Sequence, residues 1–130
     1  MTTVEQLATA LINVFEGNRL VAYKDTGGIW TIGKGHTKDV YEGMTITLEE
    51  EEEFFKQDSA PLFYAVSSIT PITRAAALVS FGYNCGIGRL LNVIKGLDTL
   101  DNPKHTTDAH GNVLNGLVTR RALELALYNA

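Results

Sequence analysis

At the start of the chain, apolar side chains recur at every third or fourth position until Gly17 interrupts the pattern. This is the spacing of an amphipathic helix. Thr3 and Gln6 form a capping box ahead of it, in which each side chain can bond the backbone amide of the other residue. We therefore expect a helix over about residues 4–16, with Glu16 in its last turn.

A strand-like pattern follows this helix. Residues 20–24 and 29–33 are rich in β-branched and aromatic side chains, and residues 25–28 between them read Asp-Thr-Gly-Gly. A short polar, glycine-rich segment between two such runs is typical of a β-hairpin. An aspartate in this position usually bonds backbone amides of the turn, so this role is the simplest interpretation of Asp25.

A second helix is predicted after residue 47, where Thr47 and Glu50 form another capping box. The acidic run 49–53 suits the positive end of a helix dipole, and we interpret it as a solvated first turn. Further apolar positions continue the helix, which we expect to kink or restart near Pro61.

The most hydrophobic run, residues 75–83, is apolar on nearly every side and predicts a buried central helix that ends at Gly86 and Gly88. Residues 98–112 are polar enough for a loop. Asn115 is expected to cap the last helix.

Composition narrows the possible functions. A chain of 130 residues with 45% hydrophobic residues suits a single domain, residues 1–130. The net charge of −4 argues against nucleic acid as a partner. The start of the chain has no basic stretch and carries Glu5 inside its apolar pattern, which argues against a signal peptide or membrane insertion. The only cysteine, Cys85, has no basic residue beside it in the sequence, and we expect it to act as a small buried hydrophobe.

Candidate chemistry is concentrated near the hairpin. Eight residues separate Glu16 from Asp25, and five separate Asp25 from Thr31. Two carboxyls and a hydroxyl that converge suit acid–base hydrolysis of an acetal. Taken singly, the three residues would be a solvated glutamate, a turn residue and an ordinary strand residue. Gly35 lets a backbone approach a ligand closely, although a glycine alone is a weak signal.

These residues form the order E-x8-D-x5-T within FEGNRLVAYKDTGGIWTIGKGHT at 15–37, which resembles the phage-type lysozymes, muramidases of glycoside hydrolase family 24. The similarity extends through FKQD at 55–58, RAAALVSFGYNCGIG at 74–88 and GLVTRRALE at 116–124. It implies a mostly helical α+β fold, lysozyme-like, with a small β-hairpin lobe, a larger helical lobe and the active-site cleft between them.

The resemblance also implies an activity. Members of this family hydrolyse peptidoglycan at the β-1,4 bond between N-acetylmuramic acid and N-acetylglucosamine, and no cofactor or metal is expected. Glu16 would protonate the leaving oxygen. Asp25 would activate or orient a water molecule with help from Thr31, as in an inverting enzyme.

Other residues receive supporting roles from the same resemblance. Gly35, Trp30 and Asn84 are expected to contact the sugar, whereas the sequence alone would make Asn84 a helix cap. His36 is expected to pair with Asp58. One of Arg120 and Arg121 is expected to reach Glu16, whereas the sequence alone would make both arginines surface partners of acids such as Glu124.

The chain is shorter than the family between about residues 90 and 115, and lacks the tryptophan usual there. The alternative function is therefore a wall-binding module with the same fold and impaired catalysis. For an active enzyme we expect a monomer whose only partner is the peptidoglycan glycan strand. It would wait in the host cytoplasm until a pore-forming partner released it to the wall, or it would reach the wall as a module of a larger particle.

Overall fold

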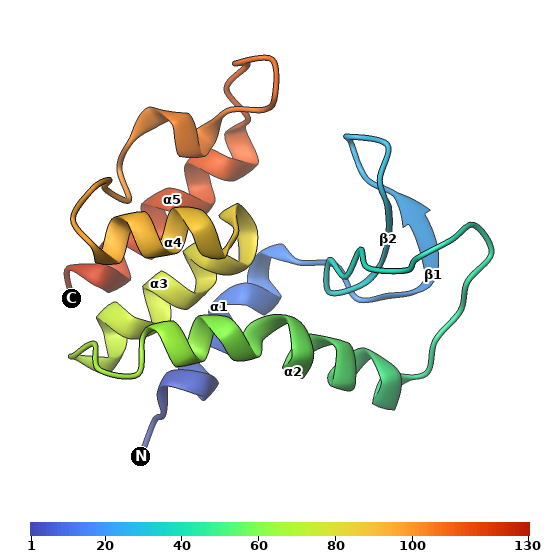
Figure 1. The fold of residues 1–130 in the computed structure, drawn as a ribbon, viewed down its shortest axis with the longest axis horizontal. Coiled ribbons are helices and arrows are strands. Elements are labelled where there is room, and N and C mark those ends of the chain that lie inside the picture. Colours follow the sequence, from blue (N-terminus) through green and yellow to red (C-terminus); the bar gives the residue numbers. More distant parts are fainter. The chain divides into compact units, whose positions relative to one another are not determined.

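The computed structural model describes residues 1–130 and separates into two compact units, Asn13–Ala60 and Met1–Ile12 with Pro61–Ala130. Its elements in chain order are α1 (Val4–Phe15), β1 (Arg19–Lys24), β2 (Trp30–Gly33), α2 (Leu48–Ala65), α3 (Ile72–Cys85), α4 (Ile87–Ile94), the 3-10 helix η1 (Pro103–Thr106) and α5 (Asn115–Tyr128) (Figure 1). The predicted α+β, mostly helical class is confirmed. None of the helices combines the length and apolar character needed to cross a membrane.

Both predicted capping boxes are present. The amide of Gln6 donates to Thr3 Oγ1 and the amide of Thr3 to Gln6 Oε1, at 3.1 and 3.0 Å. Thr47 and Glu50 exchange the same two bonds, each 3.1 Å long. These bonds satisfy amides that have no partner inside a helix, and they fix where α1 and α2 begin.

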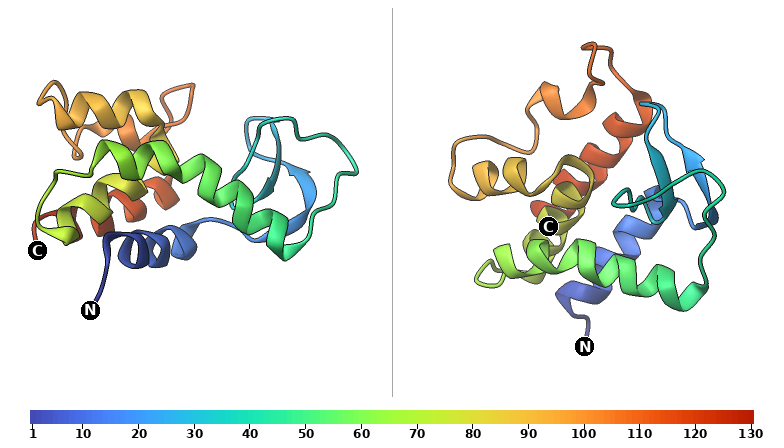
Figure 2. Two further views of the ribbon diagram at one scale, coloured as in Figure 1. Left: turned by 60° about the horizontal axis from the view of Figure 1, so that its bottom comes forward. Right: turned by 45° about the vertical axis from the view of Figure 1, so that its right-hand side comes forward.

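The unit Asn13–Ala60 is built on the predicted hairpin, whose strands run side by side in both views of Figure 2. Strands β1 and β2 are antiparallel, with Tyr23 opposite Thr31, and a bulge lies between Arg19 and Tyr23. The connection to α2 adds a third bonded segment, because the amide of Ile46 donates to the carbonyl of Leu20. Ile46 is buried, as are residues 31–33 of β2.

The other unit packs around α3, which lies against both α4 and α5. Every residue from Ala75 to Gly82 is buried, as the sequence predicted for the central helix. A Cβ at Gly82 would come within 2.7 Å of Leu90 and 2.8 Å of Leu62. Glycine at this position therefore lets α3 pack closely against Leu90 of α4 and Leu62 of α2.

Several details differ from the sequence-based expectations. Helix α2 continues through Pro61 without restarting. Gly86 ends α3 with a φ of 96°, but Gly88 lies inside α4. Asn115 is the first residue of α5 and not its cap, since Leu114 precedes the helix and no side chain caps it.

The stretch 98–112, predicted as a loop, includes the single helical turn η1. Asn102 caps this turn by accepting a hydrogen bond from the amide of Lys104. The cap explains how so polar a segment forms regular structure.

Candidate active site

Glu16 directly follows the last residue of α1 and is half-buried. Its carboxyl lies against the backbone of Gly35, where a Cβ would be only 3.1 Å from Glu16 Oε1. Gly35 also has a φ of +88°, a conformation that residues with a side chain rarely adopt. Glycine at position 35 therefore allows both the close approach of the Glu16 carboxyl and the positive φ. The structure thus brings together Glu16 and Gly35, two residues that the sequence predicted for the site.

Asp25 begins the turn between β1 and β2, and it is exposed. Its Oδ1 accepts hydrogen bonds from the amides of Gly27 and Ile29, each 2.9 Å long. The expected turn chemistry is therefore present. Both bonds use one oxygen, so Oδ2 is left facing solvent as an acceptor for water or substrate.

Thr31 and Trp30 lie on β2. Thr31 is buried, and its hydroxyl donates to the carbonyl of Ile29 at 2.9 Å. With its hydrogen already used, this hydroxyl can offer a water molecule only an acceptor lone pair. Trp30 is half-buried, and the ammonium of Lys24 lies 5.4 Å from the centre of its ring.

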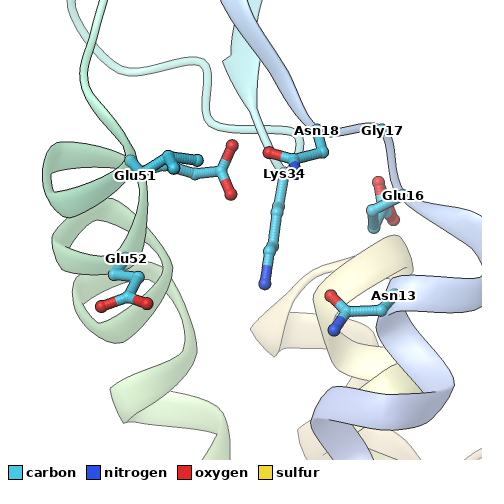
Figure 3. Close-up of a pocket in the computed structure, with 8 residues that line it drawn as sticks. Asn13, Glu16, Gly17, Asn18, Lys34, Glu51 and Glu52 are labelled. Atoms are coloured by element: carbon cyan, nitrogen blue, oxygen red, sulfur yellow. The ribbon is translucent and has the colours of Figure 1, made fainter.

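A pocket of about 430 Å³ is formed within the unit Asn13–Ala60, between the end of α1, the turn after β2 and the first turns of α2. Figure 3 shows the side chain of Lys34 extending into it, with Glu51 and Glu52 on one side and Glu16 and Asn13 on the other. The Lys34 ammonium also lies 4.7 Å from the centre of the Phe55 ring. Carboxyl groups outnumber the ammonium, so the pocket is predominantly acidic.

Glu51 corrects the prediction that residues 49–53 are all solvated. Its side chain is buried, its Cγ would be 3.2 Å from a Cβ at Gly33, and the Asn18 amide group donates to its carboxylate when the amide nitrogen faces it. The spacing contained a signal, since Glu51 precedes Phe54 and Phe55 by three and four residues. It therefore lies on the apolar face of α2.

His36 pairs with Asp58, as predicted. The distance from His36 Nδ1 to Asp58 Oδ2 is 2.8 Å, and the imidazole stacks on Phe54 with ring centres 4.1 Å apart and planes 5° apart. Asp58 and Phe54 both belong to α2. The pair therefore connects the turn after β2 to this helix, beside Gly35.

The remaining predicted site residues lie in the other unit. Asn84 is exposed near the end of α3. Arg120 and Arg121 are buried and both bind Glu124, with nitrogen–oxygen distances of 3.2 and 2.7 Å. The sequence-based interpretation of both arginines as members of surface ion pairs is wrong. Glu124 is completely buried and also accepts a 2.5 Å hydrogen bond from the Ser80 hydroxyl. The predicted contact of one arginine with Glu16 stays a prediction.

Cys85 has a basic partner that the local sequence did not reveal. Arg121 Nη1 donates to its sulfur at 2.6 Å. Burial nevertheless raises the pKa of the Cys85 thiol, although the charge of Arg121 acts in the opposite direction. The cysteine therefore behaves as a protonated, partly buried side chain.

A polar cluster around His105 was also missed. His105 is buried, with Nε2 at 3.0 Å from Asp98 Oδ2 and Nδ1 at 3.3 Å from an Arg89 nitrogen. The ring packs edge-on against Phe81 of α3. Burial lowers the pKa of His105, although the nearby carboxylate of Asp98 acts in the opposite direction. This cluster anchors the shortened segment to the helices, but no pattern in the sequence marked it.

Comparison with known proteins gives a consistent set of relatives. A family model described as phage lysozyme matches residues 13–124. The endolysin of Bacillus phage PZA is 34% identical over 143 aligned positions, which cover 98% of this chain and 55% of that protein. The SAR-endolysin of Enterobacteria phage PA-2 is 34% identical over 122 positions, covering 84% of this chain and 74% of that protein.

Among solved structures, the muramidase domain of SpmX from Asticaccaulis excentricus superposes with a TM-score of 0.77 at 29% identity. The match covers 100% of this chain and 99% of that one. The chain thus spans the whole of this domain but about half the length of the PZA endolysin.

Proposed function

Because the chain belongs to the phage lysozyme family, we propose that it is a lysozyme that hydrolyses the β-1,4 bond between N-acetylmuramic acid and N-acetylglucosamine in bacterial peptidoglycan. The observation that supports this best is the carboxyl of Glu16 against the backbone of Gly35. The hairpin of the same compact unit holds Asp25 and Thr31. Two carboxyls with separate surroundings are what acid–base cleavage of a glycoside requires.

In the proposed reaction Glu16 is the acid. Its proton passes to the glycosidic oxygen as the bond to the anomeric carbon breaks, so that the leaving sugar departs as a neutral alcohol. Because Gly35 has no side chain, the Glu16 carboxyl can lie directly against its backbone.

Asp25 is proposed to act on the water molecule. Its free Oδ2 can accept a proton from water, while the turn amides bound to Oδ1 hold the carboxylate in place. Thr31 can orient the same water as an acceptor. If the water attacks opposite the leaving group, the product has inverted configuration, and NMR of freshly released sugar would identify its anomer.

The direct test uses purified peptidoglycan and the parent protein. We expect a suspension to clear while new reducing ends appear in proportion. A protein that sediments with the peptidoglycan but releases no reducing ends would instead be the wall-binding module considered as the alternative. That result would contradict the proposal.

We also propose that the enzyme acts as a monomer and meets its substrate after a pore-forming partner has opened the host membrane. The endolysins among its relatives support a role in host lysis. Expression in bacteria with and without a pore-forming protein tests this. Lysis is expected only with the pore, and equal lysis in both strains would contradict the release route.

A further inference from the structure

A second pocket, of about 310 Å³, lies among the helices of the unit that contains Pro61–Ala130. It is formed by the loop between α2 and α3, one face of α3, the last turn of α4 and the end of α5, which is marked C in Figure 1. None of the proposed catalytic residues lines it. Its size is at the lower end of the range for small-molecule sites.

The pocket has one charged group. Arg74 is the only charged side chain that lines it, and no aspartate or glutamate does. Arg74 forms no ion pair within the chain, and its Nε is buried without a hydrogen-bond partner. Its guanidinium lies over the ring of Tyr128 at 4.7 Å. A half-buried guanidinium held by an aromatic ring but lacking an acid is suited to bind an anion from solution.

The rest of the lining is amphipathic. Leu78 stands four residues after Arg74 on the same face of α3, and Val93 and Ile94 add aliphatic surface from α4. Ser68 and Thr70 supply hydroxyls from the loop. A fully polar anion such as phosphate would leave this aliphatic surface unused.

We propose that this pocket binds an aliphatic carboxylate. The carboxylate would pair with Arg74, and a short hydrocarbon chain would lie against Leu78, Val93 and Ile94. Two sources share this chemistry, a fatty acid and the carboxyl end of a peptide with small aliphatic residues. The peptide end has an amide beside its carboxylate, which the hydroxyls of Ser68 and Thr70 could bond.

The test follows backbone amide and Tyr128 ring signals by NMR during titration with sodium hexanoate. Saturable shifts are expected at the loop 68–70 and at Tyr128, and hexanamide should bind at least about tenfold more weakly because it lacks the charge. N-acetyl-D-alanyl-D-alanine distinguishes the sources. Tighter binding than hexanoate identifies a peptide end, and weaker binding identifies a fatty acid.

Arg74→Gln should weaken hexanoate binding at least about tenfold. Arg19→Gln is the matched control, since Arg19 also stacks on a tyrosine, Tyr23, at 4.4 Å but does not line this pocket. Because Arg74→Gln could disturb α3, Ser68→Trp provides a second variant that blocks the exposed rim and keeps the arginine. Shifts that do not saturate, or that survive both pocket variants, would overturn the proposal. Neither outcome depends on peptidoglycan hydrolysis.

Discussion

One carboxylate oxygen of Asp25 accepts hydrogen bonds from turn amides, and the other remains available to water. A second aspartate makes the same turn bonds, so it can serve as a control for the turn alone. Asp108 Oδ1 accepts hydrogen bonds from the amides two and four residues later, His110 and Asn112, as Asp25 Oδ1 does in the hairpin. These bonds lower the pKa of Asp108. Asp108 lies in the unit that lacks the proposed catalytic residues.

We predict that Asp25→Asn lowers peptidoglycan hydrolysis by about 10²–10⁴-fold, the range for loss of a general base, while the fold is kept. An asparagine oxygen still accepts the turn amides but cannot take a proton from water. Asp108→Asn, the matched control, should leave the rate unchanged. Equal rates for parent and Asp25→Asn would reduce Asp25 to a turn residue.

Gly35 allows a similar comparison with Gly43. The two glycines have φ values of +88° and +85°, but a Cβ would meet Glu16 only at position 35 and nothing within 4 Å at position 43. An alanine at either position should cost about 1–2 kcal/mol of folding free energy, because a side chain disfavours this conformation. The two substitutions therefore share a backbone cost.

Only Gly35→Ala should also displace the Glu16 carboxyl. We expect its rate to fall about tenfold or more, since small misplacements of a catalytic group are costly, whereas Gly43→Ala keeps the parental rate. Urea unfolding and reducing-end release measure the two effects. Equal rates for the two variants would exclude a catalytic requirement for the contact.

At the scale of elements, α5 is joined to α3 through buried charges. Glu124 receives both arginines of its own helix and the hydroxyl of Ser80, and Arg120 also donates to the carbonyl of Ser80. A buried ion pair that loses one partner leaves the other charge uncompensated. The free energy of this contact therefore depends on Glu124 more than on either arginine.

Glu124→Gln should lower the free energy of unfolding by about 3–5 kcal/mol, because two buried guanidinium groups lose their anion. The exposed Glu49, in the first turn of α2, gives the control variant Glu49→Gln, which should change stability by less than about 0.5 kcal/mol. Denaturant unfolding measures both. A loss for Glu124→Gln no larger than the control's would mean that the cluster is not a stabilising contact.

His105 makes the attachment of η1 sensitive to pH. Burial and the Arg89 charge lower its folded-state pKa, although Asp98 acts in the opposite direction. The unfolded chain therefore binds a proton more readily than the folded one near pH 6.5. This contribution to stability is present above that pH and is lost as pH falls. Hydrogen bonds from Lys104 and Asn102 lower the pKa of Asp98. Its contribution to folding stability is therefore also lost as pH falls, but only in strong acid.

We predict that stability falls less between pH 7.5 and 5.5 in His105→Gln than in the parent. His110, an exposed histidine of the same segment, gives the control His110→Gln, which should keep the parental decline. Urea unfolding at the two pH values provides the comparison. If His105→Gln and the parent decline equally, the ring does not titrate as inferred.

Local sequence signals predicted two helix starts and one turn, where a residue bonds its near neighbours in sequence. Thr3 and Thr47 marked the helix starts through bonds spanning three residues, and Asp25 marked its turn. The prediction that Asn115 caps α5 was wrong. A cap is the residue just before the first helical one, and the sequence leaves that position ambiguous by one residue.

Contacts between distant residues could not be predicted from spacing. Arg121 meets Cys85, 36 residues earlier, and Ser80 meets Glu124, 44 residues later, so no local pattern contains either pair. His36 and Asp58, 22 residues apart, were predicted only through the family resemblance. The sequence therefore predicted the types and the order of the residues in the candidate site. The burial of Glu51, Arg120 and Glu124 could be learned only from the folded structure.

In the proposed hydrolysis of peptidoglycan Glu16 is the proton donor, and the variant Glu16→Gln tests this role. The amide keeps the shape of the side chain but has no transferable proton. The control is Glu52→Gln, which removes an exposed carboxylate from the same pocket. Reducing-end release from purified peptidoglycan is measured together with thermal unfolding.

We predict that Glu16→Gln loses at least about 10²-fold in rate with an almost unchanged melting temperature, and that Glu52→Gln retains the parental rate. Hydrolysis by a folded Glu16→Gln protein within tenfold of the parent would contradict the account.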